Sequence, residues 1–152
     1  MPAPLLQFDH QDGVLSFSIE RASYYLSENG TFSCSISCKL NHDYDYMSAP
    51  CFAAHNFVFG GAIRVGQVLE LEAKYEQNQG VEVPRVHLYA GAHYDPWSTR
   101  LEVVSIEPKR LGINGSFMTQ DPNYYDARAK NTRATFFAVF VERPVSELWS
   151  PY

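Results

Sequence analysis

Hydrophobic and polar residues alternate along much of the chain, and the alternation is most regular in residues 31–40 and 111–118. In residues 31–40 the apolar positions are Phe32, Cys34, Ile36, Cys38 and Leu40, and the polar positions between them are Thr31, Ser33, Ser35, Ser37 and Lys39. A period of two residues is typical of a β-strand that buries one face. We therefore expect residues 31–40 to form a strand of an antiparallel sheet, with the serine-bearing face in water.

Residues 101–119 are predicted to form a β-hairpin, with the rest of the chain organised around it. The turn falls at residues 108–110, and the strand that follows it alternates without a break. In the strand before the turn, the adjacent apolar residues Val103 and Val104 interrupt the alternation. Such an interruption indicates a β-bulge.

Further strands are predicted from shorter stretches of alternation or from apolar runs bounded by turn residues. They cover residues 14–21, 31–40, 52–59, 65–75, 83–90 and 132–142. We expect residues 1–12 to be a lead-in arm, because Pro2 and Pro4 disfavour regular structure. Residues 143–152 are expected to be a C-terminal tail in which Trp149 docks on the body of the protein.

These strands, with no long helix between them, predict an all-β fold. We expect a single-domain antiparallel β-sandwich of about eight strands over residues 1–152, with at most one or two short helical turns. The alternative is a β-barrel. A length of 152 residues is typical of one domain. The chain contains 45% hydrophobic and 19% charged residues, which is an ordinary composition for a globular protein.

The charge and the absence of targeting signals limit the classes of partner. A net charge of −5 without clusters of Lys and Arg argues against direct binding of nucleic acid. No apolar run is long enough to span a membrane, and residues 1–13 lack the features of a secretory signal, so we expect a cytoplasmic protein. In that setting, three cysteines are expected to be free thiols.

Two groups of titratable residues are candidates for metal chemistry. His42 lies beside Asp43 and Asp45, and His87 is followed by His93 and Asp95. Imidazole and carboxylate suit zinc or iron, but these spacings match no known metal motif. We therefore expect no metal, no cofactor and no catalytic residue, and a metal-dependent enzyme using loop His and Asp residues remains an alternative. A binding protein is favoured over an enzyme.

The strongest functional signal is aromatic. Three long loops, at residues 41–50, 91–98 and 120–131, combine tyrosine or tryptophan with aspartate. The candidate partner-binding residues are Asp43, Tyr44, Asp45, Tyr46, Tyr94, Asp95, Trp97, Tyr124 and Tyr125. Tyr and Trp are frequent at binding hot spots, because they combine a large contact area with a polar tip.

The loop composition predicts a non-catalytic protein-binding module with a basic protein partner. One version is an acidic inhibitor, of the immunity-protein or antitoxin type, that blocks a basic enzyme such as a nuclease toxin. The same rings would also suit a carbohydrate or another small ligand, which is the alternative binding function. Assembly into a homo-oligomer is compatible with the sequence as well.

Overall fold

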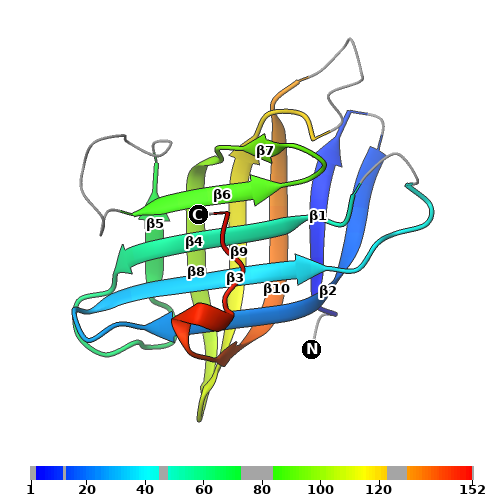
Figure 1. The fold of residues 1–152 in the computed structure, drawn as a ribbon. Coiled ribbons are helices and arrows are strands. Elements are labelled where there is room, and N and C mark those ends of the chain that lie inside the picture. Colours follow the sequence, from blue (N-terminus) through cyan, green and yellow to red (C-terminus); the bar gives the residue numbers. More distant parts are fainter. Residues whose placement is uncertain (1–2, 12, 45–47, 73–83, 123–129, 152) are drawn as a thin grey trace.

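The computed structural model describes residues 3–11, 13–44, 48–72, 84–122 and 130–151 (Figure 1). These residues form a ten-stranded sheet in which every neighbouring pair is antiparallel. The elements are β1 (Leu5–His10), β2 (Gly13–Leu26), β3 (Thr31–Cys38), β4 (Cys51–Val58), β5 (Val68–Leu71), β6 (Arg85–Tyr89), β7 (His93–Tyr94), β8 (Trp97–Glu107), β9 (Arg110–Thr119), β10 (Thr132–Glu142) and the 3₁₀ helix η1 (Val145–Glu147).

The sheet folds over on itself into two layers. Its strand order is β5-β8-β9-β10-β1-β2-β3-β4-β6-β7, and in Figure 1 the layer of β3, β4 and β6 crosses the layer of β8, β9 and β10. The long strand β2 pairs with β1 through its first half and with β3 through its second half, and its register shifts between Ile19 and Arg21. A strand that passes from one layer to the other at a bulge is a common way to turn a sheet corner.

The prediction of an all-β antiparallel sandwich is confirmed, and its two layers belong to one sheet. The edge strands β5 and β7 are not paired with each other among the described residues, so the sheet is open and the alternative of a closed barrel is wrong. Two of the ten strands, β1 and β7, were not expected. No helix in the described ranges is long and apolar enough to cross a membrane.

Phenylalanine rings fill the space between the two layers. The largest fully buried side chains are Phe8, Phe17, Phe32, Phe52, Phe117 and Phe140. Phe52 of one layer stacks on Phe117 of the other, with ring centroids 4.7 Å apart, and lies 5.4 Å from Phe136. Burying a side chain of this size contributes roughly 1.5–3 kcal/mol, so these contacts hold the layers together.

The predicted hairpin is present as β8 and β9. The expected bulge is confirmed, because the register shifts between Val103 and Ser105 opposite Gly112. On β9, Gly115 lies beneath the ring of Phe136, which comes from the neighbouring strand β10. A Cβ at position 115 would overlap that ring, so only glycine allows the two strands and the ring to pack as they do.

The prediction of a lead-in arm is wrong. Residues Leu5–His10 form β1, an interior strand between β10 and β2, and the side chains of Leu6 and Phe8 are fully buried. The two prolines precede the strand and therefore remove none of its hydrogen bonds. The alternation of Leu6, Phe8 and His10 is the local signal for this strand, but it is only three positions long.

The expectation that the serine-bearing face of β3 lies in water is also wrong. Ser33 is 5% exposed and Ser35 is 4% exposed. Residues 143–151, which we call the strap, run over this face of the sheet after β10 ends (Figure 1). The strap comes from more than 100 residues away in sequence, so the local pattern of β3 carries no sign of it.

Replacing Gly115 with alanine is expected to lower the free energy of unfolding by about 1–3 kcal/mol, the usual cost of overpacking a core. Urea denaturation of Gly115→Ala and wild-type protein measures this difference. Ser116→Ala, on the adjacent half-buried position, adds no atom to the core and serves as the matched control. If the two variants were equally stable, Gly115 would have no packing role.

Candidate functional site

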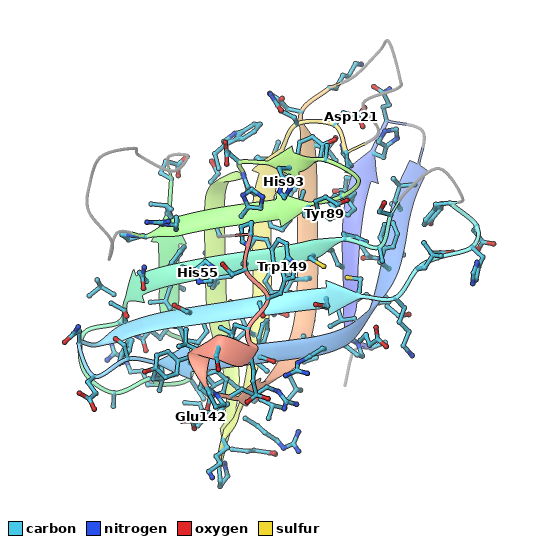
Figure 2. The ribbon with its side chains drawn as sticks, viewed as in Figure 1. His55, Tyr89, His93, Asp121, Glu142 and Trp149 are labelled. Atoms are coloured by element: carbon cyan, nitrogen blue, oxygen red, sulfur yellow. The ribbon has the colours of Figure 1, made fainter. Side chains whose placement is uncertain are left out.

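The contacts that hold the strap against the sheet include two hydrogen bonds, one buried side chain and one ion pair, and the Arg143 N–H donates the first bond to the Tyr24 carbonyl at 2.9 Å. Trp149 lies over the sheet (Figure 2), its backbone N–H donates to Ser35 Oγ at 3.0 Å, and the side chain of Leu148 is buried. Glu147 of η1 lies 3.6 Å from the Arg21 guanidinium, in a half-exposed pair. The expectation that Trp149 docks on the body is therefore met, and the strap covers β3 and the strands beside it.

A pocket of about 530 Å³ lies between the strap and the sheet. The sheet contributes Ser33, His55, Asn56 and Arg85 to its walls, and the strap contributes Val145, Ser146, Leu148 and Ser150. We call this cavity the strap pocket. Its walls are polar apart from Val145 and Leu148, and a volume of this size lies within the usual range of roughly 300–1,000 Å³ for ligand sites.

A β-bulge positions the two β4 residues that line the pocket, His55 and Asn56. Between β3 and β4 the pairing passes from Phe32 with Phe57 to Cys34 with Ala54, so that Ser33 faces two residues, His55 and Asn56. The Asn56 N–H donates to Ser33 Oγ at 3.0 Å, and Asn56 adopts a φ of 62°. Asparagine tolerates this left-handed conformation better than most residues do, and bulges of this kind are frequent beside functional sites.

The electrostatics of the pocket combine a neutral histidine with a permanent cation. Burial lowers the pKa of His55 to about 4, with further contributions from Arg85 and His87. The imidazole is therefore neutral at neutral pH, whereas the Arg85 guanidinium keeps its charge. Among the described residues that line the pocket there is no aspartate or glutamate.

Two histidines meet beside the strap. His87 Nε2 and His93 Nδ1 lie 2.7 Å apart, and the His87 ring lies 6.1 Å from the Trp149 ring. Asp95 Oδ1 lies 3.9 Å from His87 Nδ1, and the Tyr89 ring packs against His93 (Figure 2). The sequence grouped His87, His93 and Asp95, and the structure brings these three together.

The other candidate metal group, which contains His42, lies elsewhere. His42 lines a separate groove with Asp43, beside β1 and β2. In the part of the chain that the structure describes, no group of three or more His, Cys, Asp or Glu side chains is arranged to hold a metal ion. The described geometry therefore gives no support to the metal-dependent alternative.

The cysteines are not placed for nucleophilic chemistry. All three thiols are free, as expected. Burial raises the pKa of Cys34 to about 12, and it also raises the pKa values of Cys38 and Cys51. The thiolate is the nucleophilic form, so these side chains act as small buried groups at neutral pH.

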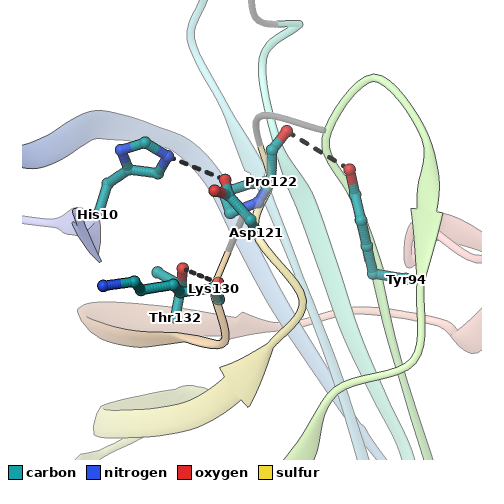
Figure 3. Close-up of polar contacts among 6 residues, drawn as sticks. All are labelled: His10, Tyr94, Asp121, Pro122, Lys130 and Thr132. Atoms are coloured by element: carbon teal, nitrogen blue, oxygen red, sulfur yellow. Dashed lines mark hydrogen bonds and ion pairs between the residues drawn. The ribbon is translucent and has the colours of Figure 1, made fainter. Parts of the chain in front are cut away.

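The three loops predicted to bind a partner do converge at one end of the sandwich. Tyr94 donates its hydroxyl hydrogen to the Pro122 carbonyl at 3.4 Å, which joins the second loop to the third (Figure 3). A Cβ at Gly91 would lie 3.8 Å from Ser48 Oγ, which places the second loop against the first. Beside them, His10 Nε2 and Asp121 Oδ1 form a buried pair at 2.9 Å (Figure 3).

The described aromatic residues of those loops largely face inward. The Tyr44 ring lies 5.4 Å from Phe17 and its hydroxyl oxygen accepts the Ser16 N–H at 3.2 Å, while Tyr94 is buried. Trp97 is half-buried at the start of β8, and Asp43 and Asp95 are exposed. The remaining candidates lie outside the described residues: Asp45, Tyr46, Tyr124 and Tyr125.

Sequence reasoning did not identify the strap pocket. Its polar residues are scattered over β3, β4, β6 and the strap, in no pattern that would mark a site along the chain. The bulge that pairs Ser33 with two residues of β4 depends on the register of two strands, which the sequence of neither strand shows. No family model, no curated protein and no solved structure matches the chain, so function has to be inferred from the geometry of these sites.

Proposed function

We propose that the protein is a non-catalytic binding module that takes a small anionic ligand in the strap pocket. The observation that carries this proposal is the set of groups on the pocket walls. One guanidinium, from Arg85, is combined with the hydroxyl groups of serines from the sheet and the strap and with the side chain of Asn56. Guanidinium binds carboxylate or phosphate oxygens through two parallel hydrogen bonds, and hydroxyl groups can donate to the remaining oxygens.

The charge of the pocket contrasts with that of the whole chain. The protein carries a net charge of −5, whereas the described pocket walls carry a cation and no carboxylate. An anion entering the pocket would therefore meet the Arg85 guanidinium at short range. The neutral imidazole of His55 adds a group that can donate or accept a hydrogen bond.

Binding is favoured over catalysis by the state of the candidate nucleophiles. The Ser33 hydroxyl oxygen accepts the Asn56 N–H, a bond that fixes the bulge rather than one that removes a proton from the hydroxyl. The pKa values of the three thiols are raised. The thiolate form that a cysteine nucleophile requires is therefore disfavoured at all three thiols.

Isothermal titration calorimetry at pH 7.5 with pyrophosphate and citrate, and with sucrose as a neutral probe, tests the proposal. We expect the anions to bind, sucrose not to bind, and Arg85→Gln to weaken anion binding at least tenfold, or about 1.4 kcal/mol. Arg110→Gln removes an exposed arginine at the tip of the β8–β9 hairpin and is the matched control. Equal affinities in the two variants, or no binding of either anion at millimolar concentration, would refute the proposal.

A protein partner at the loop end is the second candidate, in the form of an acidic inhibitor of the immunity-protein type. It is supported by the convergence of the three loops and by exposed apolar residues beside exposed acids. Val14 and Leu40 are exposed, and Leu40 and Asp43 line a groove of about 450 Å³ next to β1 and β2. Apolar contact combined with negative charge would suit a basic protein surface.

The second candidate predicts a loss of binding when the charge at the loop end is reversed. The double variant Asp43→Lys/Asp95→Lys is expected to lose a basic partner that the tagged wild-type protein retains from a lysate of the source cells, as read by mass spectrometry. Glu20→Lys/Glu28→Lys makes the same charge change at exposed positions of β2 and of the turn that follows it. Retention of the same proteins by both double variants would argue against a site at the loop end.

A further inference from the structure

The docked strap covers one ring of the histidine pair. His87 is 8% exposed, and the Trp149 ring lies 6.1 Å from it at an interplanar angle of 39°. The same tryptophan is fixed through its backbone N–H to Ser35 Oγ. A cover over an imidazole removes water from it, and this makes the charged form of the ring less favourable. By linkage, a charge on His87 makes docking of the strap less favourable by the same amount.

The bond between the two histidines limits how many protons the pair can hold. At 2.7 Å, one of the two facing nitrogens donates and the other accepts, so the accepting nitrogen carries no proton. One added proton can occupy an outward-facing nitrogen and leave this bond intact. A second added proton must occupy the accepting nitrogen, which breaks the bond and places two cations in contact.

Burial and the neighbouring His93 oppose protonation of His87, and Asp95 favours it. Burial lowers the pKa of His87, and His93 lowers it further, while Asp95 acts in the opposite direction. The Asp95 side chain is 59% exposed, so solvent screens its attraction. Arg85 and His87 in turn lower the pKa of His55. Undocking of the strap would return the side of the His87 ring that faces Trp149 to water, and the pKa of His87 would then move toward the usual value of about 6.5.

Docking of the strap is expected to weaken as the pH falls. Above about pH 6.5 the imidazole is neutral in both the docked and the undocked form, and docking has its full stability. As the pH falls below that value, the undocked form takes up protons more readily than the docked form, so docking weakens. Attraction between a charged His87 and the Trp149 ring would act against this, but a separation of 6.1 Å lies at the outer limit for a cation–π contact.

We propose that the strap is a proton-controlled cover, and that protonation of the His87–His93 pair releases Trp149 and uncovers the strap pocket. This inference assigns a regulation to the site of the proposed function and rests on that function for its purpose. The described anchors of the strap include the Arg143 and Trp149 amides, the Leu148 side chain and a half-exposed ion pair, and we infer that they can open without the sheet. The sheet beneath it is held by a continuous core of aromatic and aliphatic side chains.

Hydrogen exchange of the Trp149 backbone amide, measured by NMR on ¹⁵N-labelled protein without any ligand, tests the inference. The protection factor corrects for the intrinsic pH dependence of exchange. We expect it to fall at least threefold between pH 7.5 and pH 5.5, while the amide of Ile113 in β9 changes less than twofold. No fall at Trp149, or an equal fall at Ile113, would overturn the inference, because the strap would then not respond or the whole fold would.

Two variants separate the histidine pair from other titrating groups. His87→Gln removes the imidazole that Trp149 covers and keeps a side chain that can hydrogen bond to His93 but cannot become charged. Its Trp149 protection factor is expected to change less than twofold over the same pH range, with the Ile113 amide reporting whether the variant is folded. His42→Gln, at an exposed histidine of the first loop, should keep the wild-type fall. A fall as large as that of the wild type in His87→Gln would contradict the inference.

The exchange measurement at Trp149 and the calorimetry can refute the regulation and the proposed function separately. Exchange at Trp149 requires no ligand, so a pocket that binds neither pyrophosphate nor citrate would remove the proposed function without altering the result for the strap. Conversely, a strap that stays docked at pH 5.5 would overturn the regulation even if Arg85→Gln abolished anion binding.

Discussion

The hydrogen bond from the Trp149 amide to the Ser35 hydroxyl is the contact on which the described site depends. β3 is buried on both faces, by the phenylalanine core on one side and by the strap on the other. Hydroxyl groups buried in this way need hydrogen-bond partners, because an unsatisfied polar group in the interior is costly. Ser35 has the strap amide as its partner and Ser33 has the amide of the β4 bulge, so the strap, the bulge and the pocket between them form one unit.

The short strand β7 connects this unit to the loop end of the sandwich. Tyr94 is buried and reaches Pro122 of the third loop. Its neighbours His93 and Asp95 lie on the side of the histidine pair and the strap. Successive residues of an extended chain point to opposite faces of the sheet, and this alternation lets one short segment contact the third loop through Tyr94 and the histidine pair through His93.

Local patterns predicted most of the strands, and contacts between distant segments account for what they missed. The strand at residues 132–142 was predicted with both of its observed ends. The bulge near Val103 and Val104 was predicted because two adjacent apolar residues break the period of two. The exposure of Ser33 and Ser35 was predicted wrongly because the covering segment lies 114 residues from Ser35 in sequence. The His10–Asp121 pair spans 111 residues and is equally invisible to local reasoning. Periodicity identifies the two faces of a strand, but it does not identify what covers each face.

The position of the strap is the central claim, and nuclear Overhauser spectroscopy of the whole protein at pH 7.5 tests it most directly. The docked strap predicts cross-peaks between the indole protons of Trp149 and the ring protons of His87, since the ring centroids lie 6.1 Å apart and their edge protons lie closer. A spectrum with assigned signals for both rings and no cross-peak between them would contradict the account, because β3 would then expose its serines and the pocket would have no outer wall.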